Sequence, residues 1–152
     1  MSESLTEIAL PDLAAMEAFG ASIAAHLRAG DVIALSGGLG AGKTTLARAI
    51  LRASGYRGEV PSPTFTIIEA YDPPATKLPL VHADFYRLES PAEADEIGLD
   101  DYREGAALIA EWPENAGGFA HEPACLSIRL EIADDGRLAV AEPGADWLTR
   151  LS

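Results

Sequence analysis

A glycine-rich segment followed by lysine and threonine is the part of this sequence with the clearest chemical meaning. Residues 37–44 read GGLGAGKT and match the phosphate-loop pattern G-x-x-x-x-G-K-T in full. Glycines let backbone N–H groups wrap a phosphate, and the N-terminus of the following helix adds partial positive charge. Lys43 is expected to reach the β and γ phosphates, and the Thr44 hydroxyl to bind Mg²⁺. The nucleotide-binding residues predicted from this segment are Gly38, Leu39, Gly40, Ala41, Gly42, Lys43, Thr44 and Thr45.

Two acidic residues are candidates for the carboxylates that hold Mg²⁺ or orient an attacking water in such sites. Asp84 follows the mostly apolar residues 80–83, and Glu111 follows the apolar residues 108–110. Both are predicted at the carboxyl ends of strands, where ligands bind in parallel sheets. Glu111 is the more similar to a Walker B acid by position. Simpler alternatives stay open, because strand-end carboxylates also cap helices or precede turns.

Two further residues are candidates for contact with the nucleotide or its metal ion. Thr64 lies in the segment S-P-T-F after the phosphate loop, where a hydroxyl can reach Mg²⁺ in switch-like nucleotidases. A proline-stiffened loop that only enters a strand explains this segment equally well. Trp112 is a candidate to pack on the nucleotide or on a partner, with a tryptophan of the core or its rim as the alternative.

A histidine and a cysteine have simpler explanations than catalysis. His82 and Asp84 are alternate residues of a predicted strand and face the same way, as a pair of metal ligands would. Two residues do not make a transition-metal site, so His82 is predicted to be a hydrogen-bonded structural histidine. Cys125 is the sole cysteine and is predicted to lie in the core, without a disulfide.

The elements that must position these residues alternate between strands and helices up to Glu111. Helical spacing of apolar residues predicts helices over residues 12–28 and 44–53, on either side of a buried strand and the phosphate loop. A short helix is predicted from Ser90 toward Gly98, with Ser90 as N-cap and Glu93 completing a capping box. Strands are predicted at residues 32–35, 64–68, 80–84 and 106–110.

The C-terminal part predicts an antiparallel hairpin. Residues 126–132 and 138–141 flank the turn D-D-G, and the pair is expected at the edge of the sheet. The fold class predicted is therefore α/β, a three-layer α/β/α P-loop NTPase fold with a mostly parallel sheet and an antiparallel C-terminal edge hairpin. Residues 1–152 are expected to form a single domain.

Net charge limits the partners that the chain can bind directly. At −13 the protein repels a phosphate backbone, and no run of lysine and arginine offsets this. Direct binding of DNA or tRNA is disfavoured, so any contact with tRNA is expected to be indirect, through a partner. The first residues show no basic start, and no apolar run has the length of a membrane helix. A soluble, cytoplasmic protein without a membrane partner is expected.

A series of motifs in one order makes the reading more specific than the phosphate loop alone. The motifs are SGGLGAGKTT from Ser36, SPTFT from Ser62, HADFYRL from His82, EIGLDD from Glu96 and EWPE from Glu111. The series covers most of the chain and resembles the bacterial TsaE (YjeE) family, the P-loop ATPases of tRNA threonylcarbamoyladenosine biosynthesis.

The resemblance implies weak ATP hydrolysis with Mg²⁺, in a complex that contains the TsaD and TsaB proteins. That complex transfers a threonylcarbamoyl group to the adenosine beside the anticodon in tRNAs that read codons beginning with A. The ATP cycle of the family member is expected to reset or activate the transferase. Carried over, Lys43, Asp84 and Glu111 are the catalytic candidates, Thr44, Glu111 and Thr64 the metal candidates, and Trp112 joins the nucleotide-binding residues. Which acid is catalytic and which holds Mg²⁺ stays open.

Two positions depart from the family pattern. Gly38 stands where the family commonly has aspartate, and Pro61 where it has serine or threonine. These changes bear on rate and loop movement more than on nucleotide binding. Two other functions remain alternatives: a small-molecule kinase, and a nucleotide-gated adaptor that hardly turns over. A kinase usually closes an arginine-bearing lid, and beyond Arg48, Arg52 and Arg57 no arginine cluster is present.

Overall fold

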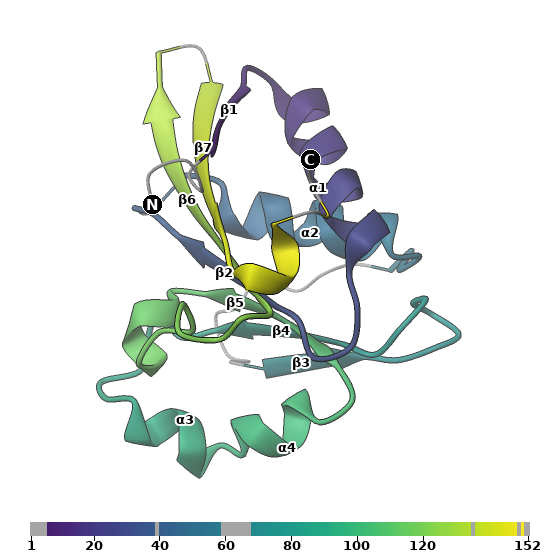
Figure 1. The fold of residues 1–152 in the computed structure, drawn as a ribbon, viewed down its shortest axis with the longest axis vertical. Coiled ribbons are helices and arrows are strands. Elements are labelled where there is room, and N and C mark those ends of the chain that lie inside the picture. The colour runs from purple at the N-terminus through teal and green to yellow at the C-terminus, as the bar shows by residue number, and fades with distance from the viewer. Residues whose placement is uncertain (1–5, 39, 59–67, 135, 149, 151–152) are drawn as a thin grey trace.

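A mixed sheet runs through the protein, with helices on both of its faces (Figure 1). The computed structural model describes residues 6–38, 40–58, 68–134, 136–148 and 150. Within these residues the seven strands are ordered β1-β7-β6-β2-β5-β4-β3. Their bounds are β1 Thr6–Leu10, β2 Val32–Ser36, β3 Ile68–Tyr71, β4 Leu80–Asp84, β5 Ala107–Glu111, β6 Cys125–Ala133 and β7 Gly136–Pro143.

Parallel pairing is confined to the centre of the sheet. β2 lies between β5 and β6 and is parallel to both, and β4 is parallel to β5. The other described pairings, β1 with β7, β6 with β7 and β3 with β4, are antiparallel. The prediction of a mostly parallel sheet is therefore corrected to a mixed one. The physical reason is that β3 and β4, like β6 and β7, are joined by short connections, which suit antiparallel neighbours and cannot make a crossover.

The predicted C-terminal hairpin forms, but it does not lie at the edge of the sheet. β1 pairs outside β7, with Leu10 opposite Arg137, and is itself the edge strand. Sequence reasoning missed this strand because its side chains are largely exposed and leave almost no apolar alternation to read. The consequence is that the chain enters helix α1 directly beside the hairpin turn.

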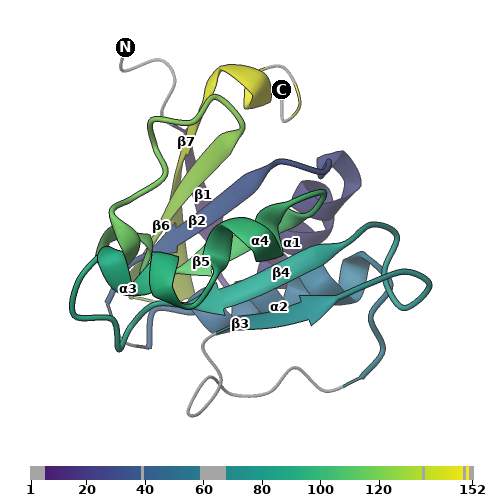
Figure 2. The ribbon, with the colours of Figure 1, turned by 90° about the horizontal axis from the view of Figure 1, so that it is seen from below.

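Helices cover the two faces of the sheet in separate layers (Figures 1 and 2). α1 (Leu13–His26) and α2 (Lys43–Ala53) lie on one face, and α3 (Ala92–Glu96) and α4 (Leu99–Arg103) on the other. Alternate residues of β2 divide between the layers, since Ile33 packs in the core with α1 and α2 while Val32 packs in the core with α3 and α4. The predicted three-layer α/β/α class is confirmed.

The helix pair α1 and α2 packs closely behind the phosphate loop. Asp12 caps α1 by accepting a hydrogen bond of 2.8 Å from the amide of Ala15. Where the two helices meet, a Cβ added to Gly20 would lie 2.5 Å from the Cβ of Ala49, so the backbones approach as near as glycine allows. None of the helices that the structure describes is long and apolar enough to be a membrane span.

The segment that leads into α3 differs from its prediction. α3 begins at Ala92, its N-cap position is Pro91, and no side chain caps it. Glu93 accepts a hydrogen bond of 2.7 Å from the amide of Glu89, so the predicted capping box with Ser90 is wrong. The helix starts one residue later than predicted, which moves Glu93 out of register with Ser90. The strand predicted at 64–68 is described only from Ile68, and residues 64–67 lie outside the described part.

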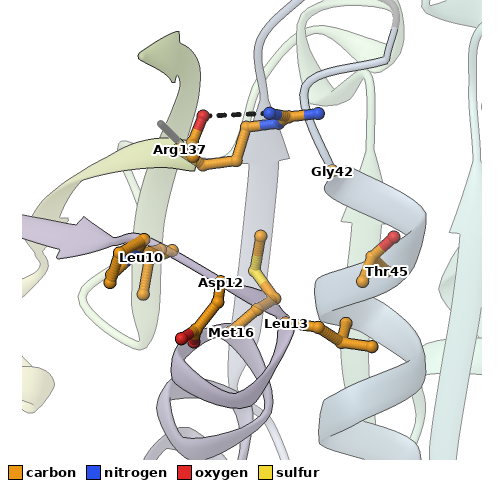
Figure 3. A pocket seen from close by; sticks show the side chains of 9 residues that line it. Leu10, Asp12, Leu13, Met16, Gly42, Thr45 and Arg137 are labelled. Carbon is orange, nitrogen blue, oxygen red and sulfur yellow. Dashed lines mark hydrogen bonds between the residues drawn. The ribbon is translucent and has the colours of Figure 1, made fainter. Parts of the chain in front are cut away.

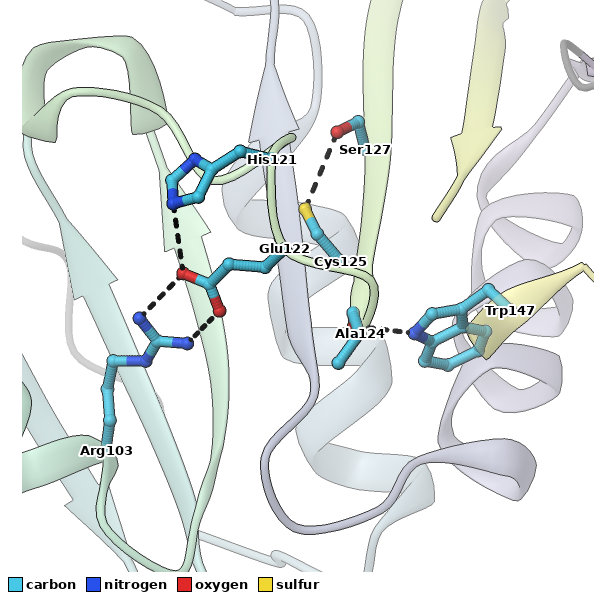
Figure 4. A network of polar contacts seen from close by, with 7 residues as sticks. All are labelled: Arg103, His121, Glu122, Ala124, Cys125, Ser127 and Trp147. Carbon is cyan, nitrogen blue, oxygen red and sulfur yellow. Dashed lines mark hydrogen bonds and ion pairs between the residues drawn. The ribbon is translucent and has the colours of Figure 1, made fainter. Parts of the chain in front are cut away.

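Side-chain hydrogen bonds hold the start of β6, which lies at the end of the sheet opposite the phosphate loop (Figure 4). Arg103, the last residue of α4, donates two hydrogen bonds of 3.0 and 2.6 Å to the carboxylate of Glu122. The indole of Trp147, from the short 3-10 helix Ala145–Trp147, donates to the carbonyl oxygen of Ala124 at 2.8 Å. Cys125 is buried at the start of β6, as predicted. These contacts hold β6, and with it the hairpin, against the centre of the sheet.

Candidate nucleotide-binding site

The carboxyl ends of three neighbouring strands meet beside the phosphate loop. The loop follows β2, Glu111 ends β5, and Asp84 ends β4. In the sheet register Glu111 lies opposite Leu35 of β2 on one side and opposite Asp84 on the other. Residues far apart in the sequence therefore converge on one edge, as the strand-end argument predicted.

The phosphate loop itself turns on glycines in left-handed conformations. Gly37 has a φ of 132° and Gly42 a φ of 108°. A Cβ on Gly37 would overlap the carbonyl oxygen of Leu130 in β6, so this position accepts no side chain in place. Gly42 occupies the N-cap position of α2, which places the helix N-terminus at the loop. Leu39, one of the predicted binding residues, lies outside the described residues.

Lys43 is held at the mouth of the loop. Its Nζ donates to the carbonyl oxygens of Gly37 and Gly38, each at 2.8 Å, and lies 4.3 Å from the centroid of the Trp112 ring. Only 5% of the side chain is exposed. Burial lowers the pKa of Lys43 from its ordinary value, and the nearby carboxylates of Glu111 and Asp84 oppose that shift. The ammonium is thus a poorly hydrated charge beside the loop, suited to an anionic ligand.

Thr44, Glu111 and His82 form a continuous hydrogen-bonded chain. The Thr44 hydroxyl donates to Oε1 of Glu111 at 2.7 Å, and Nε2 of His82 lies 2.6 Å from Oε2 of the same carboxylate. Glu111 is 2% exposed and His82 is 5% exposed. His82 is hydrogen-bonded, as predicted, but its partner was not foreseen. It fixes the orientation of an acid whose other oxygen contacts the hydroxyl of the phosphate loop.

Asp84 lies beside this chain and is half-buried. Its Oδ1 accepts a hydrogen bond of 2.9 Å from the amide of Tyr86, so it caps the turn after β4. Burial raises the pKa of Asp84 from its ordinary value of 3.8, and the neighbouring carboxylate of Glu111 adds to this effect. The amide of Tyr86 and the positive charges near it oppose the rise. Asp84 both caps the turn and lies beside Glu111. The two sequence interpretations, a capping residue and a carboxylate of the nucleotide site, are therefore compatible.

Trp112 has an unusual backbone conformation for an aromatic residue. Its φ of 56° and ψ of 50° are left-handed, and it is the only non-glycine residue with positive φ in the described part of the chain. Its amide donates to the carbonyl oxygen of Leu35 at 3.1 Å, and its ring lies 5.0 Å from that of Tyr86. The turn aims the half-buried indole across the site, between Tyr86 and Lys43.

A pocket of about 340 Å³ opens on the other side of the loop (Figure 3). Its walls come from the junction of β1 and α1, the start of α2 and the hairpin turn. The lining residues are Leu10, Pro11, Asp12, Leu13, Met16, Gly42, Thr45, Gly136 and Arg137. Of these, sequence reasoning had named only Gly42 and Thr45 as binding residues. The others come together through the pairing of β1 with β7, which has no local signal in the sequence.

The predicted metal candidates are only partly brought together. Thr44 and Glu111 are in contact, whereas Thr64 lies outside the described residues. In the described part of the chain, no group of three or more His, Cys, Asp or Glu side chains is arranged to hold a metal ion. A metal at this edge would therefore need oxygen ligands from a bound molecule as well.

Comparison with known proteins identifies the family of this fold. The family model described as "Threonylcarbamoyl adenosine biosynthesis protein TsaE" matches residues 10–139. The tRNA threonylcarbamoyladenosine biosynthesis protein TsaE of Haemophilus influenzae is 38% identical over 141 residues, which cover 89% of this chain and 87% of that protein. The protein of the same name from Streptomyces coelicolor is 43% identical over 143 residues, with coverages of 88% and 95%.

A solved structure is similar over nearly the whole chain. The crystal structure of YdiB from Bacillus subtilis aligns with a TM-score of 0.72 at 29% identity, covering 96% of this chain and 89% of that one. The residues matched by the family model include β2, β4 and β5, whose carboxyl ends meet at the site. The chain belongs to the family of threonylcarbamoyl adenosine biosynthesis proteins TsaE.

Proposed function

We propose that this chain is a Mg²⁺-dependent ATPase whose activity supports the formation of N6-threonylcarbamoyladenosine beside the anticodon of tRNA. The observation that carries the proposal is the contact between Thr44, the hydroxyl residue of the phosphate loop, and the buried acid Glu111. A glycine-rich turn with a solvated lysine would require neither this contact nor the burial of Lys43. Family membership supports the pathway, because the relatives are named for tRNA threonylcarbamoyladenosine biosynthesis.

The side chains at the strand ends and in the first turn of α2 fit Mg²⁺ better than a transition metal. Thr44, Glu111 and Asp84 offer hard oxygen donors, and Mg²⁺ is usually bound by one or two carboxylates together with substrate phosphates. When bound with a nucleotide, Mg²⁺ would neutralise charge on the phosphate oxygens. We assign Thr44 and Glu111 to holding it, since they already contact each other at the helix N-terminus.

The remaining polar groups have distinct roles in this proposal. Backbone N–H groups of residues 38–45 and the ammonium of Lys43 bind the phosphates. Asp84 is less buried than Glu111 and has a raised pKa, so we assign it to orienting the attacking water. Trp112 covers the site from the β5 side and limits the entry of bulk water.

The pocket beside Gly42 and Thr45 suits the nucleoside part of the ligand. Leu10, Leu13 and Met16 give it apolar walls, as flat aromatic bases require. Its volume of about 340 Å³ is at the lower end of the range of about 300–1,000 Å³ for small-molecule sites. ATP is accordingly the ligand that we propose, with the base in this pocket and the phosphates at the loop.

Contact with tRNA is proposed to be indirect. The net charge of −13 opposes binding of a polyanion, so the chain is expected to act through the TsaD and TsaB proteins. ATP hydrolysis here would then change the state of that complex, while the transfer itself occurs elsewhere.

Calorimetric titration with MgATP tests the assignment of the site. The Lys43→Ala variant is expected to bind at least about tenfold more weakly, because a charge-assisted contact to phosphate contributes about 1.5–3 kcal/mol. Lys77→Ala is the matched control, since Lys77 is the other lysine of the chain and is exposed. Equal affinity of Lys43→Ala and wild type would overturn the assignment.

A further inference from the structure

An arginine of the hairpin reaches across to the phosphate loop (Figure 3). Arg137, in β7, donates from Nε to the carbonyl oxygen of Ala41 at 3.1 Å and from Nη2 to that of Gly40 at 3.1 Å. Its Nη1 donates to the carbonyl oxygen of Gly136 at 2.9 Å. The guanidinium thus joins two successive loop carbonyls to the hairpin turn, although 96 and 97 positions separate it from them in the sequence.

The position of this arginine is set by the sheet and not by the loop. β7 pairs with β1 on one side and β6 on the other, and Arg137 lies opposite Leu10 and Ile132. A planar guanidinium with fixed donor directions, anchored on a strand paired on both sides, is a rigid template for the two carbonyls. A flexible ammonium would not impose the same geometry.

Fixing the carbonyls also fixes the amides that follow them. In a planar trans peptide the C=O and the next N–H point in opposite directions. Because the carbonyls of Gly40 and Ala41 point to Arg137, the N–H groups of Ala41 and Gly42 point away from it. The amide of Ala41 indeed points away from Arg137 and donates to the carbonyl oxygen of Gly38 at 3.2 Å, an acceptor that a bound phosphate would have to replace. A phosphate loop binds anions through the direction of such N–H groups.

We propose that Arg137 is a positioning residue that orients the peptide groups of the phosphate loop and so sets its affinity for polyphosphate. The inference rests on the proposed function, since it takes the loop to be the phosphate site. This role gives a function to the contact between the hairpin and the phosphate loop. It also assigns a role to a residue that the motif series does not contain. In this role Arg137 acts through the loop backbone.

Because Arg137 also lines the pocket, a direct contact with the base is the rival explanation. The two explanations are distinguished by comparing the binding of two ligands. Magnesium tripolyphosphate has the phosphates without a base, whereas MgATP has both. If Arg137 acts through the loop, Arg137→Gln weakens both ligands by a similar factor, about tenfold, as expected for loss of charge-assisted hydrogen bonds. Weaker MgATP binding with unchanged tripolyphosphate binding would overturn the inference in favour of base contact. Unchanged affinity for both would also overturn it.

Two further variants and one spectroscopic measurement complete the test. Arg137→Lys keeps the positive charge but loses the planar, fixed set of guanidinium N–H donors. It is expected to recover only part of the affinity that Arg137→Gln loses. Arg129→Gln is the matched control, because Arg129 lies on β6, is 56% exposed and pairs with Glu131. Affinity equal to wild type is expected for that control.

Amide hydrogen exchange keeps the inference testable if Arg137→Gln folds poorly. In Arg137→Lys, exchange is expected to be faster at residues 40–42 and unchanged in the strand interiors of β6 and β7. If exchange instead became faster throughout the chain, Arg137 would have a general structural role, which would contradict the proposal. If wild type bound neither ligand, the proposed function itself would fail. If wild type bound both ligands and the Arg137 variants bound them equally well, only the inference about Arg137 would fail.

Discussion

The hydroxyl of Thr44 donates a hydrogen bond of 2.7 Å to Oε1 of Glu111, although the two residues are 67 positions apart in the sequence. The parallel pairing of β2 with β5 explains the contact, because it places Glu111 opposite Leu35 at the start of the phosphate loop. An acid on one strand is thereby tied to the first turn of the helix that follows the loop. Substitutions of Glu111 should therefore alter the place where the phosphates and Mg²⁺ are proposed to bind.

Replacing Glu111 by glutamine is expected to impair hydrolysis more than binding. The amide keeps the size of the side chain but loses the charge that we assign to Mg²⁺, so kcat should fall about 100-fold. Affinity for the nucleotide should change much less, since the loop and Lys43 are untouched. Glu142→Gln, on the exposed part of β7, is the control. Steady-state kinetics with unchanged kcat would contradict the role of Glu111.

Asp84→Asn is expected to lower activity and raise stability at neutral pH. The pKa of Asp84 is raised above 3.8 in the folded protein, so its ionised form costs stability above that raised pKa, and the cost disappears as pH falls through it. Asparagine removes the charge and can still accept from the Tyr86 amide. Urea unfolding should show a stabilised variant at neutral pH, with the difference shrinking in acid.

The pH dependence of hydrolysis provides the second part of this test. If the carboxylate of Asp84 orients water, kcat/KM of wild type, which reports groups of the free enzyme, should fall in acid at a pH above that of an ordinary aspartate, because the pKa of Asp84 is raised. A destabilised Asp84→Asn variant would contradict the expected gain in stability, and a variant with wild-type kcat would refute the assignment of Asp84 to the attacking water.

His82→Phe is expected to destabilise the protein and slow hydrolysis. The change leaves Oε2 of a buried carboxylate without the nitrogen that now lies 2.6 Å away. An unsatisfied buried acceptor costs about 1–3 kcal/mol, more when it is charged. Chemical denaturation measures the loss of unfolding free energy, and kcat measures the loss of Glu111 orientation. No change in either quantity would show that His82 does not position Glu111.

Neighbouring glycines of the loop should respond in opposite ways to alanine. Gly37→Ala should destabilise by about 2 kcal/mol or more, because φ is 132° and the new Cβ would overlap the carbonyl oxygen of Leu130. Gly38→Ala should stabilise by about 0.4–1 kcal/mol, since open space surrounds a Cβ there and the unfolded chain loses entropy. Equal effects in urea unfolding would contradict the described loop geometry.

Local patterns predicted where the phosphate-loop motif and the two acids lie in the fold. The phosphate loop lies between a buried strand and a helix, and Asp84 and Glu111 end adjacent strands, as expected. Each of these features is encoded within a short segment, by glycine spacing or by an apolar run that ends in an acid. The three-layer fold class followed from the alternation of such segments.

Long-range pairings could not be predicted in the same way. β1 has few buried residues of its own and is defined by its pairing with β7. The contact of Arg137 with the loop depends on that part of the sheet, so an isolated arginine after a D-D-G turn gave no signal. His82 was recognised as hydrogen-bonded, but its partner 29 positions away became visible only with the parallel pairing of β4 and β5.

The proposal of an ATPase coupled to a partner complex is decided by steady-state hydrolysis of ATP by the purified chain, alone and with the TsaD and TsaB proteins. We expect slow release of phosphate by the chain alone, faster release with both proteins, and none with Lys43→Ala, while Lys77→Ala matches wild type. Bound MgATP without hydrolysis under either condition would contradict the proposal in favour of an adaptor. A phosphorylated metabolite formed in step with ADP would contradict it in favour of a kinase.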